Sequence, residues 1–135
     1  MLTKEEIFAM PEEDYMNQKQ LEFFKNLLKI QLEQLNSSIK QAKENLLENE
    51  HNIDPNDVAS QQEIQQLFLR TVEREGRLLN KVNKSLQCIE NGEYGYCKAT
   101  GEPIGLKRLY ARPTASLSIA AKEAQEHKEK TEGNH

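Results

Sequence analysis

The chain has 135 residues, of which 36% are hydrophobic, 6% are aromatic and 30% are charged, and it contains no tryptophan. This supply of apolar side chains is small for a large core and suits a long helical structure with a mostly solvated surface. The net charge of −4 argues against a general nucleic-acid binder. No apolar run approaches the ~18 residues of a membrane span, and the first six residues lack the features of a secretory signal. Only two cysteines are present, Cys88 and Cys97, so we expect a soluble cytoplasmic protein without disulfide bonds.

Two helix-start signals lie near the N-terminus. Thr3 followed by Glu6 forms a capping box and predicts a short helix with Ile7 on its apolar side. Asn17 followed by Gln20 has the same spacing and predicts the start of a much longer helix.

Two long segments, about 17–49 and about 55–90, carry apolar residues at mixed steps of three and four. This spacing is typical of a coiled-coil seam. Two such helices joined by a short turn predict an antiparallel hairpin whose arms are each roughly 50 Å long. The expected seam residues are Leu28, Leu32, Leu35, Ile39, Ala42 and Leu46 in the first arm and Ile64, Phe68, Val72, Leu79, Val82, Leu86 and Ile89 in the second.

The seam of the second arm is interrupted at Glu75, where the pattern calls for an apolar residue. One interpretation is that Arg74 and Glu75 pair locally or face a partner. The other is a solvated kink in the helix pair. The sequence leaves both open.

The turn near residues 50–59 carries two carboxylates. Asp54 before Pro55 predicts a helix N-cap, and Asp57 then falls near the positive end of the helix dipole. Capping alone explains both acids. A functional interpretation is compatible with it, because exposed carboxylates at the tip of a hairpin can approach a bound metal ion or a basic groove.

Residues 93–113 are rich in glycine and tyrosine and predict a compact module with a short hairpin around Gly101. A last helix is expected to start after a cap at Thr114 or Ser116 and to end near Lys130. We expect the module to be held by the packing of Tyr94, Tyr96, Ile104, Leu106, Leu109, Leu117 and Ile119.

Part of this module has the spacing of a zinc ribbon. Cys97 is followed three residues later by Thr100, where a second thiolate would stand, and Ser118 and Ala121 repeat the spacing without sulfur. Structural zinc needs four nitrogen or sulfur ligands, so one thiolate cannot hold it. Cys97 is either a small, partly buried side chain or a redox-sensing thiol with Lys98 as the nearby cation.

Basic residues gather around the same module. Lys107, Arg108, Arg112 and Lys122 lie within it or just after it, and Lys81 on the second arm could face the same way. Such a set can hold phosphates, or it can pair with neighbouring glutamates. No phosphate-binding loop and no Ser/His/Asp set is present, so the residues alone do not indicate an enzyme.

The sequence resembles the DksA/TraR family of transcription factors over nearly its whole length from Glu13. Any one of the matching segments alone is a weak signal, and together they are specific. They are EDYMN at 13–17, DPNDVA at 54–59, GYC at 95–97, IGLKRL at 104–109 and ARPTA at 111–115.

The resemblance implies a coiled-coil hairpin on a globular base, which binds bacterial RNA polymerase by inserting its tip into the secondary channel. The tip residues of the family match Asp54, Asp57 and Ala59, whereas Val58 stands where the family often has arginine. It also implies ppGpp as an effector, bound at the polymerase interface. The alarmone-contacting positions correspond to Leu78, Lys81, Arg108, Arg112 and Lys122.

The zinc positions depart from the family, since typical members carry four cysteines and this chain has only Cys97 with Thr100, Ser118 and Ala121 in the other three places. The chain is similar in this to the zinc-independent members. We therefore expect a mostly α fold without cofactor or metal. Its predicted parts are an N-terminal segment of the base (1–15), a coiled-coil hairpin (16–92), and a degenerate zinc-finger-like module with a C-terminal helix (93–135).

The predicted function is non-enzymatic control of transcription initiation by a protein that we expect to be a monomer, without sequence-specific DNA binding or membrane attachment. Two alternatives are open. A transcript-cleavage factor of the Gre type also carries acids on a coiled-coil tip, where they hold a catalytic magnesium ion. A generic coiled-coil adaptor is the third interpretation.

Overall fold

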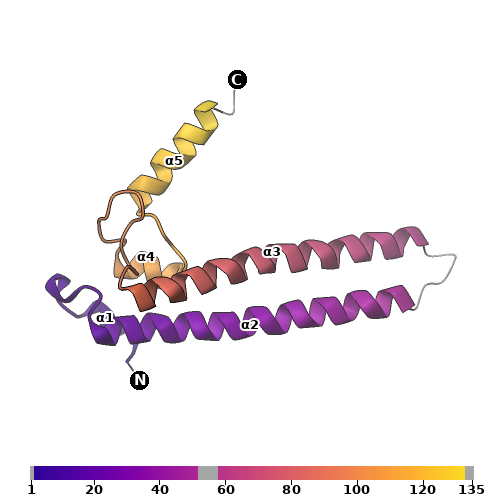
Figure 1. Cartoon of the computed structure of the whole chain (residues 1–135), viewed down its shortest axis with the longest axis horizontal. Coiled ribbons are helices and arrows are strands. Elements are labelled where there is room, and N and C mark those ends of the chain that lie inside the picture. The colour runs from indigo at the N-terminus through magenta and orange to yellow at the C-terminus, as the bar shows by residue number, and fades with distance from the viewer. Residues whose placement is uncertain (1, 52–57, 133–135) are drawn as a thin grey trace. The chain divides into compact units, whose positions relative to one another are not determined.

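The structure is a computed structural model that describes residues 2–51 and 58–132 (Figure 1). Within these ranges the chain is helical and contains no strand, which confirms the predicted fold class. None of the described helices is long and apolar enough to cross a membrane. The elements are α1 (Lys4–Phe8), the 3-10 helix η1 (Glu12–Asp14), α2 (Gln18–His51), α3 (Val58–Asn91), α4 (Leu106–Ala111) and α5 (Ile119–Glu132).

The chain divides into two compact units. The base unit combines Met1–Leu28 with Lys84–His135, and the hairpin unit is Lys29–Asn83. Both chain ends thus contribute to one unit, as the resemblance implied for the globular base. The division into 1–15, 16–92 and 93–135 stays a prediction.

In the hairpin unit, the long helices α2 and α3 run side by side and antiparallel (Figure 1). Leu35, Ala42 and Val82 are buried between them. The predicted seam is wrong at Ile64, which is 42% exposed. Gln61 and Gln65 are half-buried instead. These glutamines continue the alternation of three and four residues from Phe68 toward the tip, so the seam there is polar.

The N-terminal starts of α1 and α2 follow the predicted local rules. Thr3 Oγ1 accepts a hydrogen bond from the Glu6 N–H at 3.2 Å. Asn17 Oδ1 accepts from the Gln20 N–H at 2.8 Å, and Gln20 Oε1 accepts in turn from the Met16 N–H at 2.6 Å. The side chains therefore satisfy N–H groups that a helix start leaves unpaired.

The base unit has an apolar core drawn from both ends of the chain. Seven apolar side chains are buried there. In addition, α1 packs against α4, with Phe8 and Tyr110 edge to face at 5.8 Å. The expected packing is wrong at two positions, since Tyr96 is 40% exposed and Ile119 is 57% exposed. The buried seven are Ile7, Phe24, Leu28, Tyr94, Cys97, Ile104 and Leu109.

The last helix starts later than predicted. α5 begins at Ile119, and its first turn is capped by Ser118, whose Oγ accepts a hydrogen bond from the Ala121 N–H at 3.2 Å. Neither Thr114 nor Ser116 provides this cap. The predicted hairpin around Gly101 is present as a tight turn, because the Gly101 N–H donates to the Cys97 carbonyl at 2.8 Å. The short helix α4 was not anticipated.

Candidate functional site

The predicted tip residues Asp54 and Asp57 lie outside the described part of the chain. Ala59 lies in the first turn of α3 and is exposed. On the described side of the turn, Asn49 Nδ2 of α2 donates a hydrogen bond to the Gln61 carbonyl of α3 at 3.1 Å. This bond joins the C-terminal part of α2 to the N-terminal part of α3.

Three of the five predicted ppGpp residues lie in the base unit. Arg108 on α4 is half-buried, and its Nε donates to the Leu117 carbonyl at 2.9 Å. This bond holds α4 beside the segment that leads into α5, which carries Lys122. Arg112, the C-cap of α4, is exposed. The elements that carry Arg108, Arg112 and Lys122 are therefore adjacent.

Lys122 is the one member of this basic group with an ion pair in the described residues. Its Nζ lies 4.0 Å from Glu126 Oε1, one turn along α5. Both side chains are well exposed, so the pair contributes little to stability. The other two predicted ppGpp residues, Leu78 and Lys81, lie on α3 in the hairpin unit, half-buried and exposed respectively. A convergence of all five stays a prediction.

Of the four degenerate zinc positions, only Cys97 carries a thiol. Cys97 is only 3% exposed. Hydrogen bonds from the Thr100 side chain and, with a smaller effect, from the Ser118 backbone lower the pKa of the Cys97 thiol from 9.0 to about 6, against the opposing effect of burial. From the sequence, Thr100, Ser118 and Ala121 were identified only as positions where a zinc ligand is missing. Two of them, Thr100 and Ser118, are the groups that lower the pKa of the remaining thiol.

These residues do not fit a structural zinc ion. Such a site requires four nitrogen or sulfur ligands, and Cys97 is the single thiolate among the four positions. No group of three or more His, Cys, Asp or Glu side chains that could hold a metal occurs anywhere in the described ranges.

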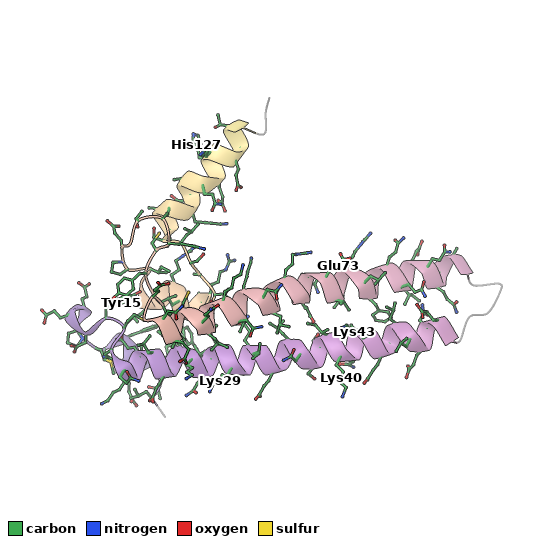
Figure 2. The ribbon with its side chains drawn as sticks, viewed as in Figure 1. Tyr15, Lys29, Lys40, Lys43, Glu73 and His127 are labelled. Atoms are coloured by element: carbon green, nitrogen blue, oxygen red, sulfur yellow. The ribbon has the colours of Figure 1, made fainter. Side chains whose placement is uncertain are left out.

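Tyr15 joins the N-terminal segment to the module. Its hydroxyl donates to the Gly95 carbonyl at 2.5 Å and accepts from the Gly105 N–H at 3.0 Å. Both glycines have positive φ, 93° and 105°, a conformation that side chains other than glycine rarely adopt. Burial raises the pKa of Tyr15, and the backbone groups of Gly105 and Ile104 act in the other direction with a smaller effect, so the phenol stays neutral. Figure 2 shows Tyr15 extending toward the module.

A carboxylate occupies the interrupted seam position in the hairpin unit. Glu75 is half-buried, and its Oε2 atom is buried without a hydrogen-bond partner in the described structure. No ion pair joins it to Arg74 within the described residues. The helix α3 continues through this position to Asn91. The suggested local pairing is therefore wrong, because neither Arg74 nor Glu75 has an ion pair in the described part of the chain.

Two family models match nearly all of the chain from residue 20 to residue 127. The DnaK suppressor protein DksA N-terminal domain matches residues 20–89, which include most of α2 and α3. The prokaryotic dksA/traR C4-type zinc finger matches residues 92–127. The first match alone spans more than half of the chain. The chain belongs to the DksA family.

Relatives in the DksA family are similar over most of their length. A protein of Caulobacter vibrioides is 39% identical over 131 residues, which cover 96% of this chain and 92% of the relative. One of Salmonella typhimurium is 40% identical over 121 residues, covering 89% and 80%. Both carry the name RNA polymerase-binding transcription factor DksA. This agrees with the prediction of a non-enzymatic protein.

A solved structure has the same fold. Transcription factor DksA2 from Pseudomonas aeruginosa superposes with a TM-score of 0.88 at 43% sequence identity, covering 95% of this chain and 99% of that one. Although the zinc-finger model of the DksA family is of the C4 type, residues 92–127 of this chain contain one cysteine, Cys97.

Proposed function

We propose that this protein binds bacterial RNA polymerase, inserts the tip of its hairpin into the secondary channel and modulates transcription initiation together with ppGpp. The observation that supports this most is the match to RNA polymerase-binding DksA proteins over 96% of the chain at 39% identity. The hairpin of two 34-residue helices supports it as well. At 1.5 Å per residue, each arm is roughly 50 Å long.

In this proposal, Asp54, Asp57 and Ala59 at the tip meet elements near the polymerase active centre. The carboxylates act through position and charge, without making or breaking a bond. Promoters whose open complexes are short-lived lose most occupancy. The protein works as a cytoplasmic monomer and needs no structural zinc, since Cys97 alone cannot supply four ligands.

The ppGpp site is composite in this proposal, with Leu78, Lys81, Arg108, Arg112 and Lys122 on one side and polymerase on the other. Arginine and lysine offer the donors that phosphate groups take. The exposed side chain of Arg112 supports this role, because its guanidinium forms no ion pair in the described part of the chain.

The proposal is tested by promoter-complex lifetimes and polymerase binding with Asp57→Asn. Asparagine keeps a capping side chain and loses the charge, so affinity should stay within about a few fold while the effect on open complexes disappears. Glu63→Gln, which removes one charge from an exposed residue of α3, is the matched control and should behave as the parent. Full activity of Asp57→Asn would refute a role for this charge.

The proposed ppGpp site is tested with Arg112→Glu and Lys122→Glu. Lys107→Glu on α4 is the control for charge reversal. The first two should abolish the added effect of ppGpp and retain part of the basal activity. Tight ppGpp binding by the isolated protein in calorimetry would overturn the composite site. Release of RNA fragments from backtracked elongation complexes would instead identify a Gre-type cleavage factor.

A further inference from the structure

Met10 lies between the N-terminal segment and the start of α2, and its sulfur accepts two hydrogen bonds from side-chain amides. Asn17 Nδ2 donates to Met10 Sδ at 3.3 Å, and Gln20 Nε2 donates to the same sulfur at 3.5 Å. The Met10 N–H donates to the Ile7 carbonyl at the end of α1. Residues 10, 17 and 20 all belong to the base unit. We call Met10, Asn17 and Gln20 the thioether site.

The orientation of both amides is fixed by the cap of α2. Asn17 Oδ1 accepts a hydrogen bond from the Gln20 N–H at 2.8 Å, and Gln20 Oε1 accepts one from the Met16 N–H at 2.6 Å. Since each amide oxygen already accepts a backbone N–H, the NH2 group of each amide has to be the half that faces the sulfur. The bonds that begin the helix therefore also direct two donors at Met10.

The sulfur of Met10 is a poor acceptor for these two donors. A thioether accepts hydrogen bonds only weakly. Gln20 is 0% exposed, so water cannot replace the sulfur as its acceptor. Within the described residues, Gln20 Nε2 has no acceptor other than Met10 Sδ. Because a buried donor without a good acceptor is unfavourable, the thioether site would be stabilised by a stronger acceptor at the position of the sulfur.

Oxidation of Met10 by a peroxide supplies such an acceptor. The lone pair of Sδ forms an S–O bond, the O–O bond of the peroxide breaks, and the other oxygen leaves as water. The sulfur loses two electrons and the peroxide gains them. The resulting sulfoxide is polar, and its oxygen accepts hydrogen bonds better than a thioether sulfur does. Met10 is half-buried, so a small oxidant can reach it. Its rotatable side-chain bonds allow the new oxygen to turn toward the amides.

Met16 differs from Met10 although both are half-buried. The side chain of Met16 packs tightly against Gly95, where an added Cβ would lie 2.7 Å from Met16 Cγ and 2.8 Å from its Sδ. The hydrogen bonds to a methionine sulfur in the described residues both end at Met10. Oxidation of Met16 would therefore place a polar oxygen in a crowded contact, whereas oxidation of Met10 places it beside two donors.

We propose that Met10 is a reversible oxidation site for peroxides, whose sulfoxide is held by the side-chain amides of Asn17 and Gln20. Oxidation replaces two hydrogen bonds to sulfur by bonds to oxygen and keeps the N-terminal segment attached to α2. Methionine sulfoxide reductase reverses the change, with the oxygen leaving as water while two thiols of the reductant become a disulfide. The inference goes beyond the proposed function, since it requires neither polymerase nor ppGpp.

The test measures the melting temperature of the full chain before and after treatment with hydrogen peroxide. A protein with Met16→Leu leaves Met10 as the oxidisable methionine of the described residues. Dithiothreitol then restores oxidised thiols, and mass spectrometry locates the added oxygen and checks that both cysteines are unmodified. In a second protein Asn17→Asp is added, because aspartate still caps the helix but has no N–H to donate. Met10→Leu combined with Met16→Leu is the control for Met1.

We expect the Met16→Leu protein to be oxidised at Met10 while folded and to melt afterwards at the same or a higher temperature. With Asn17→Asp added, oxidation should lower the melting temperature by about 3 °C or more, because the sulfoxide oxygen then faces a carboxylate. The control without Met10 should not change. In nitrogen–proton correlation spectra, the side-chain amide protons of Asn17 and Gln20 should move downfield on oxidation and return after treatment with methionine sulfoxide reductases.

Four results would overturn the inference. Met10 could resist peroxide in the folded protein while a peptide of residues 5–19 is oxidised. Its oxidation could lower the melting temperature with Asn17 in place. The change on oxidation could be equal with and without Asn17→Asp, or equal in the control without Met10. If Asn17→Asp does not fold, the amide protons of the Met16→Leu protein decide, and resonances that do not move on oxidation overturn the site. None of these outcomes affects the proposed function, because polymerase is absent from the assay.

Discussion

The groups around Cys97 stabilise its thiolate without a metal ion. Hydrogen bonds from Thr100 and Ser118 stabilise the thiolate and hold the pKa at about 6, whereas the ordinary value is 9.0. Between these two pH values the folded state carries thiolate while the unfolded chain carries thiol. The unfolded state thus binds more protons there, and stability rises with pH.

We predict that the melting temperature of the parent rises relative to that of Cys97→Ser as pH increases from about 6 to about 9. The contribution is complete above the unfolded pKa and is lost as pH falls through the folded one. Serine does not titrate in this range, and the other titrating groups are shared by both proteins. Thermal scans in matched buffers measure the difference. A difference independent of pH would contradict the lowered pKa.

Cys97 also shows which contacts can be predicted from local sequence patterns and which cannot. Thr3 and Asn17 were predicted as caps because their partners are three residues away. The spacing of residues 97, 100, 118 and 121 indicated a degenerate zinc site. That Thr100 and Ser118 donate to Cys97 requires the module to be folded, so spacing alone could not show it. Nor could spacing show the two hydrogen bonds of the Tyr15 hydroxyl, whose partners lie 80 and 90 residues away.

At the scale of the helix, Glu75 is an unfavourable residue in the apolar part of the seam, between Val72 and Leu79. Its Oε2 atom is buried without a hydrogen bond in the described structure. A buried polar atom left unpaired costs about 1–3 kcal/mol. The adjacent Gly76 is a poor helix former and costs roughly another 1 kcal/mol relative to alanine. The middle of α3 is therefore a locally weak part of the hairpin.

We predict that Glu75→Leu stabilises the protein by about 1–3 kcal/mol, because it fills the seam and removes the unpaired oxygen. Urea unfolding followed by circular dichroism measures the change. Glu73→Leu is the matched control, since Glu73 is exposed, and it should change stability by less than about 0.5 kcal/mol. Equal effects of the two substitutions would show that Glu75 is not buried in solution.

Helix boundaries were predictable where local chemistry decides them and wrong where distant contacts do. The last helix was expected from Thr114 or Ser116. Instead, the Lys98 N–H donates to the Ser116 carbonyl and the Tyr94 hydroxyl to that of Pro113, at 2.8 Å each. Arg108 binds the carbonyl of Leu117. These bonds hold residues 113–117 out of the helix, and none is visible in the local sequence. The hairpin arms depend mainly on periodicity and were predicted well, apart from Ile64.

At the scale of the molecule, the base unit is expected to fold without metal. Its core residues come from both chain ends, and their burial contributes about 25 cal/mol per Å² of apolar surface. Domains that depend on structural zinc unfold in chelator because metal binding supplies their folding free energy. This base offers one thiolate where such domains offer four ligands.

We predict that strong chelator leaves the melting temperature unchanged and that the purified protein carries no stoichiometric zinc. The matched control restores all four thiolates by Thr100→Cys, Ser118→Cys and Ala121→Cys. That variant should bind one zinc ion per chain and lose stability in chelator, because the set of four cysteine ligands is then complete. One zinc per chain in the parent by elemental analysis would contradict the prediction.

Tyr15 has a consequence for the order in which the protein becomes folded during synthesis. The hydrogen-bond partners of its hydroxyl, Gly95 and Gly105, are synthesised 80 and 90 residues later. The two arms of the hairpin can pair earlier, starting at the turn, where contacts are local and fast to form. Until residues 93–113 have left the ribosome, the apolar side chains of the N-terminal segment cannot be buried against them. A nascent chain interrupted after Asn91 would therefore expose Phe24 and Ile7, and such exposed apolar surface is what chaperones recognise.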